Sequence, residues 1–416
     1  MKWKILIIVC MLLVLLSSLP TYAHTEKIAL VMKAFTNPFF IQMRYGALKT
    51  AEKLHLTLDY FSIKYETDID SQIKIIENII ESDEYSGILI APADSKRLIP
   101  PLKQAIDKGI KVINLDNKLD NKTLQKYHLK IPFVGPDNFR GGEKIGEYVK
   151  YKLGGKGNVI IMEGIPSAIN AIERRKGFLK GLSESDIKII TSLVANWHQD
   201  EAFNKLLSFF KNYYGRIDAV LCANDEMALG AVQALYFLEK NDTFVTGYDN
   251  IDEIRPFIWS KKVYATIEQH PFEMGRVGVE EMVKLLNGED IPIWRKIPTD
   301  LITYETFGKK VGIYFSYPIS FSKEILKNWG EMNGEEVFIT TRPDLIPTLG
   351  LDLLIVIGND KKDIYKIKDI NSLPILFIKY SGETSPKLEK KISYVITNYF
   401  RGMPYGDFFK ETKLIK

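Results

Sequence analysis

Short apolar segments alternate with longer amphipathic segments along the first part of the chain. The apolar segments lie at 28–32, 56–61, 87–91 and 112–115. Between them are segments with the 3.6-residue period of a helix, which run up to residue 54, from 69 to 82 and up to 108. Strands and helices that follow each other in strict turn form crossover units. The pattern therefore predicts a parallel sheet covered by helices.

The same pattern starts again near residue 158. Its predicted strands are 158–162, 188–190, 219–222 and 244–247, and its predicted helices are 172–182, a segment ending near 212, and 228–238. Two α/β units of similar size thus follow one another. In open sheets of this kind ligands bind outside the carboxyl ends of the strands, so the polar residues that follow each strand are the candidates for binding.

A third α/β stretch begins near Lys309. Its predicted strands are 311–315, 336–339, 353–357 and 375–378, and its predicted helices are 322–332 and 388–400. The 416 residues of the chain exceed what a single hydrophobic core usually holds. We therefore expect residues 309–416 to form an additional α/β domain, whose role the sequence does not indicate.

The N-terminus has the order of a secretory signal peptide. Lys2 and Lys4 precede an apolar run from 5 to 16, and the small-residue pattern Thr21-Tyr22-Ala23 follows. This run is shorter than the about 20 apolar residues that span a membrane. We expect residues 1–23 to be a signal peptide and the mature protein to be periplasmic or otherwise extracytoplasmic. An uncleaved membrane anchor is the alternative.

Charge and cysteine content exclude some functions. The formal charge of +4 becomes +2 without the first 23 residues, since Lys2 and Lys4 leave with them, and no dense basic stripe indicates a nucleic-acid partner. Cys10 lies in the predicted signal peptide, so the mature chain cannot form an internal disulfide. Cys222 lies in an apolar run and is predicted to be a small buried residue.

Polar and aromatic residues follow the predicted strands where a binding cleft is expected. They are Asn37, Phe39 and Phe40 after the first strand, Asp116 and Asn117 after the fourth, Asn224 after 219–222, and Tyr248 and Asp249 after 244–247. An aromatic ring can stack on the apolar face of a sugar, while planar polar groups bind its hydroxyls. Simpler interpretations stay open, because Phe39 and Phe40 could belong to the core and Asp225 could cap a helix.

Several blocks, in order, resemble the ribose-binding type of periplasmic sugar-binding protein, which has the type I periplasmic binding fold shared with lac-repressor-like ligand domains. The blocks are 37–40 (Asn-Pro-Phe-Phe), 115–116, 173–174, 177–178, 223–230, 247–249 and 265–269, within a match from about 27 to 307. The block at 223–230 is the most specific of them.

This resemblance implies a fold of two Rossmann-like lobes with parallel sheets, joined by a three-crossing hinge near 134–137, 269–271 and 297–301. A sugar-binding domain would occupy 24–308. Its lobe 1 would comprise about 26–135 and 271–297, and its lobe 2 about 136–269 and 298–308. The small α/β domain at 309–416 is an addition to the family pattern.

The resemblance also implies roles for individual residues. In the first lobe Asn37 would line the site, Phe39 or Phe40 would stack on the sugar ring, and Asp116 would accept hydrogen bonds from hydroxyls. The implied residues of the second lobe are Arg174, Trp197, Asn224, Tyr248 and Asp249, with Gln269 at the hinge. Without the resemblance, Arg174 could lie on a solvated helix face and Trp197 could be core.

Two positions depart from the ribose-binding pattern. The family typically has arginine where this chain has Asn117, and phenylalanine where it has Tyr248. An asparagine has a different reach from the five-donor guanidinium and adds an acceptor. The sequence therefore favours a monosaccharide or similar polyol other than ribose.

The implied mechanism is hinge closure over the sugar, which a membrane partner then recognises. One candidate partner is the permease of an ABC-type transporter. The alternative is a membrane sensor, such as a histidine kinase or chemoreceptor, which the additional domain favours.

Other classes of function fit less well. The glycine cluster at 154–157 precedes a strand, unlike a phosphate-binding loop, and the five histidines lack metal-ligand spacing. We predict no catalytic residue, no metal site and no cofactor. DNA-binding regulators that share this core carry a helix-turn-helix before the first strand. Here a predicted signal peptide takes that place, so no nucleic-acid partner is expected.

Overall fold

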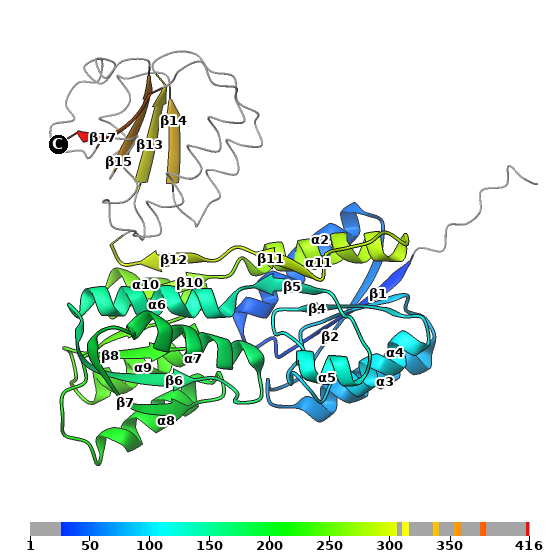
Figure 1. The fold of residues 1–416 in the computed structure, drawn as a ribbon, viewed down its shortest axis with the longest axis horizontal. Coiled ribbons are helices and arrows are strands. Elements are labelled where there is room, and N and C mark those ends of the chain that lie inside the picture. The colour runs from blue at the N-terminus through cyan, green and yellow to red at the C-terminus, as the bar shows by residue number, and fades with distance from the viewer. Residues whose placement is uncertain are drawn as a thin grey trace, which may run out of the picture.

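The computed structural model describes residues 26–305 and, beyond them, the backbone of five strands between Lys310 and Ile415. The first sheet has the strand order β11-β5-β4-β3-β1-β2, and all its neighbours are parallel. Its strands are β1 (Lys27–Met32), β2 (Thr57–Ser62), β3 (Gly87–Ile90), β4 (Lys111–Leu115), β5 (Phe133–Pro136) and β11 (Trp294–Ile297). This sheet and its helices form the first lobe (Figure 1).

The helices of the first lobe bury both faces of its sheet. Alternate residues of β1 point to opposite faces, so Leu30 packs toward α2 (Pro38–Lys53) and α11 (Pro271–Leu286). Val31 packs on the other face, toward α3 (Ile69–Ser82) and α4 (Ile99–Asp107). The short helix α5 (Asn121–Lys126) adds Leu124 to that second core. Burial on both faces explains why these strands are continuous apolar runs.

The second sheet has the order β12-β10-β9-β8-β6-β7 and defines the second lobe. Its strands are β6 (Lys156–Glu163), β7 (Asp186–Val194), β8 (Ala219–Cys222), β9 (Phe244–Thr246), β10 (Val263–Glu268) and β12 (Asp300–Thr303), of which only β12 is antiparallel to its neighbour. Its helices are α6 (Asn138–Lys152), α7 (Ile169–Leu182), α8 (Gln199–Phe210), α9 (Asp225–Phe237), the 3-10 turn η1 (Asp252–Ile254) and α10 (Arg255–Trp259). Cys222 is fully buried in this core, as the sequence predicted.

Small residues and caps define how the helices of the second lobe begin and pack. Helices α6 and α7 lie so close that a Cβ on Gly177 would come within 2.2 Å of the carbonyl oxygen of Phe139. Helix α9 is capped by Asn224, whose side chain accepts from the backbone N–H of Met227. The interpretation of Asp225 as the cap is therefore wrong, because Asp225 is the first helical residue.

The chain crosses between the two lobes three times. It leaves the first sheet after β5, returns from β10 into α11, and passes from β11 to β12 through residues 298 and 299. Figure 1 shows the two lobes side by side, with these crossings along one edge. The predicted fold class, two α/β lobes with mostly parallel sheets, is confirmed.

A third sheet lies beyond the second lobe in sequence. It has the order β14-β13-β15-β16-β17, in which the first four strands are parallel and β17 is antiparallel to β16. Its strands are β13 (Lys310–Phe315), β14 (Glu336–Thr340), β15 (Leu353–Gly358), β16 (Ile375–Lys379) and β17 (Lys413–Ile415). The first four coincide with predicted strands, whereas β17 was not expected.

Some expectations fall on residues outside the described part of the chain. These are the signal peptide at 1–23 and the helices at 322–332 and 388–400. Within the described residues, no helix combines the length and the apolar character needed to cross a bilayer. The same residues contain no cluster of three or more side chains suited to hold a metal ion.

Candidate functional site

A closed pocket lies between the two lobes, where the carboxyl ends of both sheets meet. Its empty volume is about 240 Å³. The first lobe contributes Lys33, Asn37, Phe39, Phe40, Glu66 and Asp116, and the second contributes Asn170, Arg174, Trp197, Asn224, Asp249 and Gln269. All twelve residues are buried. A small ligand held between these side chains would contact both lobes at once.

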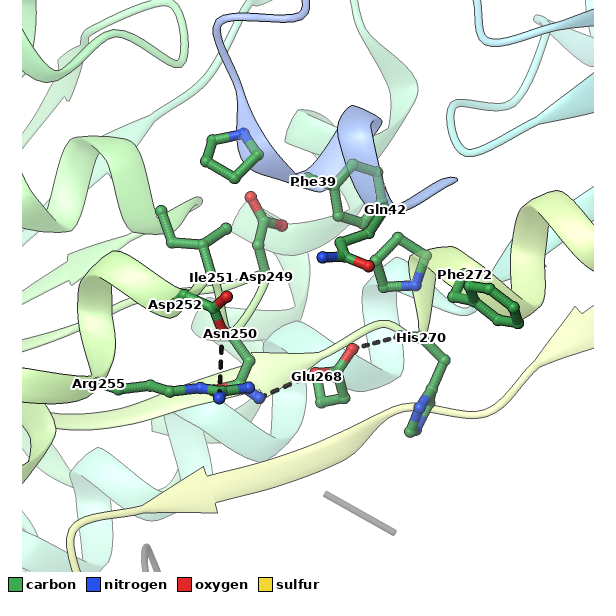
Figure 2. A pocket seen from close by; sticks show the side chains of 12 residues that line it. Phe39, Gln42, Asp249, Asn250, Ile251, Asp252, Arg255, Glu268, His270 and Phe272 are labelled. Carbon is green, nitrogen blue, oxygen red and sulfur yellow. Dashed lines mark hydrogen bonds and ion pairs between the residues drawn. The ribbon is translucent and has the colours of Figure 1, made fainter. Parts of the chain in front are cut away.

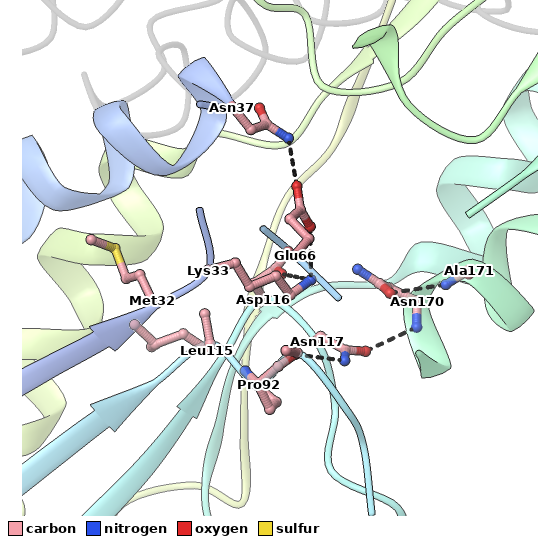
Figure 3. Close-up of polar contacts among 12 residues, drawn as sticks. Met32, Lys33, Asn37, Glu66, Pro92, Leu115, Asp116, Asn117, Asn170 and Ala171 are labelled. Carbon is pink, nitrogen blue, oxygen red and sulfur yellow. Dashed lines mark hydrogen bonds and ion pairs between the residues drawn. The ribbon is translucent and has the colours of Figure 1, made fainter. Parts of the chain in front are cut away.

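The first-lobe half of this pocket is a buried ionic network (Figure 3). The Nζ of Lys33 lies 3.3 Å from Asp116 Oδ2 and 3.7 Å from Glu66 Oε2. The side-chain amide of Asn37 donates to Glu66 Oε1 at 3.2 Å, while its oxygen caps α2 by accepting from the N–H of Phe39. Burial raises the pKa of Glu66, although Lys33 and Asn37 oppose this shift.

Aromatic rings line both sides of the pocket. Phe39 and Phe40 lie in the first turn of α2 and meet edge to face, with ring centroids 5.2 Å apart. The ammonium of Lys33 lies 5.5 Å from the Phe40 ring. Trp197 comes from the loop between β7 and α8 in the second lobe. Aromatic rings from both lobes thus line the pocket.

The second-lobe half is organised around the guanidinium of Arg174. Its N–H groups donate to Asn138 Oδ1 at 2.8 Å, to the carbonyl of Ala223 at 2.7 Å and to Gln269 Oε1 at 3.0 Å. Asp249 Oδ1 lies 3.5 Å from Nη1 and also accepts from the side-chain amide of Gln269. These bonds hold the planar guanidinium in one orientation at the pocket wall.

Burial also changes the electrostatics of this half. It raises the pKa of Asp249 well above its ordinary value, and the charge of Arg174 offsets only part of that shift. A buried carboxylate is stabilised by further hydrogen-bond donors. A ligand with hydroxyl groups would supply such donors.

Three pocket residues have backbone conformations that are rare for residues other than glycine. The φ angles are 59° at Asp116, 73° at Trp197 and 121° at Asp249. Such conformations cost on the order of 1 kcal/mol or more each and concentrate at functional sites. The surrounding structure therefore forces these three side chains toward the pocket at some cost in stability.

Nine of the eleven residues predicted from the sequence line this pocket, and two do not. Asn117 points away: its oxygen accepts from the N–H of Asn170 at 3.1 Å, and its amide donates to the carbonyl of Pro92 at 3.0 Å. The Tyr248 ring lies beneath the guanidinium, with its centroid 3.8 Å from Arg174 Cζ. Asn117 thus joins the lobes, and Tyr248 positions an arginine.

Three lining residues were missed by the sequence reasoning. Lys33 follows β1 directly, so the rule about carboxyl ends of strands could have identified it. Glu66 lies in the loop between β2 and α3, and Asn170 in the first turn of α7. The sequence carries no signal for the path of that loop.

A larger pocket, with about 850 Å³ of empty space, lies beside the first along the hinge (Figure 2). It shares Phe39 and Asp249 with the smaller one. In it Arg255 meets Asp252 at 3.1 Å and Glu268 Oε2 accepts from the side chain of Asn250 at 2.8 Å. We take the smaller pocket as the binding site, because it gathers nine of the eleven residues predicted from the sequence.

Two α/β lobes linked by three crossings, with a buried polar pocket between them, define a hinged ligand-binding protein of the type I periplasmic binding fold. The family model described as "Periplasmic binding protein domain" matches residues 28–290. The chain belongs to this family of periplasmic binding proteins.

Several relatives are similar over most of their length. The D-ribose/D-allose-binding protein of Pseudomonas aeruginosa is 39% identical over 63% of this chain and 83% of its own. The D-allose-binding periplasmic protein of Escherichia coli is 33% identical over 67% of this chain and 90% of its own. Among solved structures, an ABC transporter periplasmic solute-binding protein from Actinobacillus succinogenes with bound D-allose is 34% identical, with a TM-score of 0.64, and covers 67% of this chain and 98% of its own. These relatives are binding proteins.

Proposed function

We propose that this protein captures a neutral monosaccharide in the closed pocket and delivers it to an ABC-type transporter. The names of its relatives, which bind D-ribose or D-allose, support this class of ligand. The charges of the pocket support a neutral molecule, because both of its cations already have carboxyl partners: Lys33 pairs with Asp116 and Glu66, and Arg174 pairs with Asp249. A phosphorylated or carboxylated sugar would add negative charge to this set.

One observation carries the proposal. Within the described residues, the indole Nε1 of Trp197 is buried in the pocket wall without a hydrogen-bond partner, and Asp116 Oδ2 accepts no hydrogen bond although the ammonium of Lys33 lies 3.3 Å from it. A buried polar atom left unpaired costs about 1–3 kcal/mol. A hydroxylated ring could donate to Asp116 and accept from Trp197, so it would satisfy both lobes at once and favour the closed form.

Titration calorimetry with a panel of sugars tests this function. We expect heat from at least one neutral pentose or hexose, with D-allose and D-ribose tested first, and none from the corresponding sugar phosphates. Because Trp197 lies in the pocket wall, binding should also change the tryptophan fluorescence. A panel of neutral sugars that produces neither heat nor a fluorescence change would contradict the proposal.

Export and the absence of catalysis belong to the same proposal. The N-terminal pattern of Lys2, Lys4 and the apolar run at 5–16 supports removal of residues 1–23 during export. Radiolabelled sugar that is recovered chemically unchanged after release from the protein would support a binding role without catalysis. N-terminal sequencing of the exported protein would identify the cleavage point.

A role in sensing is the second candidate, because the third sheet extends beyond the region shared with the relatives. The relatives align with no more than about two thirds of the chain. A membrane sensor could recognise this extra domain together with the closed lobes. Neighbouring genes for a permease and an ATPase would favour transport, and a neighbouring sensor kinase gene would favour signalling.

A further inference from the structure

Helix α7 of the second lobe begins without a capping side chain of its own. Its N-cap residue is Ala168, whose methyl group cannot accept from the backbone N–H groups that the first turn of a helix leaves unpaired. The side chain of Asn170 accepts from the N–H of Ala171 at 2.9 Å, and the carbonyl of Ala168 accepts from Ile172 at 3.3 Å. The N–H groups of Ile169 and Asn170 therefore need acceptors from outside the helix.

The first lobe supplies both of these acceptors (Figure 3). Ser95 lies in the loop between β3 and α4, and its Oγ accepts from the N–H of Ile169 at 3.0 Å. Asn117 lies in the loop between β4 and α5, and its Oδ1 accepts from the N–H of Asn170 at 3.1 Å. The hydroxyl of Ser95 also donates to Asn117 Oδ1 at 3.4 Å. Ser95 and Asn117, both fully buried, thus form a cross-lobe cap on α7.

The first lobe alone orients Asn117 for this contact. Its amide nitrogen donates to the carbonyl of Pro92 at 3.0 Å, which directs its oxygen toward α7. Its backbone carbonyl accepts from the side chain of Asn114 at 2.8 Å, and Asn114 Oδ1 accepts from the N–H of Leu119 at 2.9 Å. An arginine, which the ribose-binding type typically has at position 117, carries donors only and could not accept from Asn170.

The cross-lobe cap lies next to the pocket, although neither Ser95 nor Asn117 lines it. Asn117 directly follows Asp116, which lines the pocket from the first lobe. Asn170 and Arg174 line it from the second lobe, and both belong to α7. Opening of the pocket moves Asp116 away from Asn170 and so breaks the cap. In the closed form the cap fixes α7, with its two pocket residues, against the first lobe.

We propose that Ser95 and Asn117 are positioning residues for sugar binding, which cap α7 only in the closed form and stabilise that form without contacting the sugar. This inference rests on the sugar binding proposed above. In the open form water takes the place of the two acceptors. Closure exchanges these waters for oriented side chains of the other lobe, and this exchange favours the form that holds the ligand.

Titration calorimetry and stopped-flow fluorescence of Ser95→Ala and Asn117→Ala test this proposal. We expect Ser95→Ala to raise the Kd for the sugar about 3- to 10-fold, the net effect of one lost hydrogen bond, and Asn117→Ala to raise it at least as much. The change should fall on the dissociation rate, because the cap forms after the sugar enters and must break before it leaves. The association rate should stay within about twofold of the wild type.

The matched control is Thr243→Val, which also removes the hydrogen bond of one buried hydroxyl. The hydroxyl of Thr243 donates to the carbonyl of Ile217 at 2.6 Å, and both residues belong to the second lobe. This substitution should lower the thermal stability but leave the Kd and the dissociation rate unchanged. An equal rise of the Kd in Thr243→Val would overturn the proposal, because the loss of any buried hydroxyl would then weaken binding.

Hydrogen exchange of the wild type adds a readout that a merely structural cap would not change. A sugar at 100 times its Kd lowers the open population about 100-fold. We expect exchange at the amides of Ile169 and Asn170 to slow at least about tenfold, and exchange at Ala171, whose partner lies within α7, to change less. Unchanged exchange at Ile169 and Asn170 would mean that the cap persists in the open form, contrary to the proposal.

The outcomes separate this proposal from the function on which it rests. A wild-type Kd and dissociation rate in both Ser95→Ala and Asn117→Ala would remove the cap from the closing mechanism while sugar binding itself stands. A wild-type protein that binds no neutral sugar would instead refute the proposed function, and the role of the cap would fall with it.

Discussion

The carboxyl group of Asp116 is held at the pocket wall by a left-handed backbone and by the nearby charge of Lys33. Hydrogen bonds to a charged group contribute about 1.5–3 kcal/mol. We therefore expect Asp116→Asn to raise the Kd for the sugar about 10- to 100-fold in titration calorimetry. Asp107→Asn, on the surface of α4, should leave the Kd unchanged. An unaltered Kd in Asp116→Asn would remove this residue from the binding site.

Tyr248 allows a contrasting test, because its ring contacts Arg174 but its buried hydroxyl has no partner within the described residues. Removing an unpaired buried hydroxyl costs little and can stabilise a protein. Tyr248→Phe should therefore keep the sugar Kd within about twofold, since the ring still supports the guanidinium. Tyr248→Ala should weaken binding about tenfold or more, because Arg174 loses that support. A large loss of affinity in Tyr248→Phe would instead indicate direct contact between the hydroxyl and the sugar.

For individual residues, the sequence predicted most of the side chains that line the pocket, but it missed two of the charged ones, Lys33 and Glu66. Residues after strand ends could be found because parallel strands end together. Glu66 could not, since the loop that carries it follows no periodic pattern. Asn117 follows a strand as the rule requires, yet its side chain turns toward Pro92 and Asn170, and only the packing of the two lobes decides that orientation.

At the scale of the elements, an ion pair ties the loop after β4 to helix α7 across the two lobes. Lys118 Nζ lies 2.9 Å from Glu173 and 4.2 Å from the Trp294 ring centroid. We expect Glu173→Gln to raise the dissociation rate of the sugar roughly two- to fivefold, because a partly exposed ion pair contributes at most about 1 kcal/mol to the closed form. Stopped-flow fluorescence measures this rate.

The matched control for that variant is Glu163→Gln. Glu163 pairs with Arg175, also on α7, but both partners belong to the second lobe. The Glu163 side chain is 22% exposed and that of Glu173 is 23%, so solvent screens them similarly. Equal effects of the two substitutions would mean that the Lys118 pair has no special role in closure.

The hinge contains a histidine whose pKa is raised by its neighbours. His270, between β10 and α11, lies 2.8 Å from Asp300, which begins β12. Burial alone would lower the pKa of His270, but the hydrogen bond to Asp300 and the charges of Glu268 and Glu273 raise it above its ordinary 6.5. The stability from this contact is therefore fully present below about pH 6.5 and is lost as the pH rises through the raised pKa.

Denaturant unfolding between pH 5.5 and 8.5 checks this hinge prediction. His270→Gln should remove part of the loss of stability that the wild type shows as the pH rises across this interval. Identical pH profiles for both proteins would contradict it.

The sequence predicted elements well where periodicity is strong. The strands of both sheet centres and the helices between them follow the alternation of apolar and amphipathic segments. The strands β5, β11 and β12 have four residues each and lie outside that alternation. The tertiary fold brings β11 and β12 to sheet edges and β5 between β11 and β4, and such short segments give no periodic signal of their own.

For the whole molecule, the buried thiol of Cys222 offers a measure of how strongly the sugar stabilises the closed protein. Cys222 ends β8 in the core of the second lobe, and burial raises the pKa of its thiol well above the ordinary value. A thiol reagent can reach it only when the lobe opens. The reagent would report Cys222 alone in a Cys10→Ser background, since the chain has two cysteines.

A ligand that binds only the folded form and is present at 100 times its Kd lowers the unfolded population about 100-fold. We therefore expect labelling to slow by about that factor in the presence of the sugar, and by only about 2- to 11-fold in Asp116→Asn at the same sugar concentration, because its Kd is about 10- to 100-fold higher. Labelling at one rate with and without bound sugar would mean that the second lobe opens locally around β8 while the ligand stays bound.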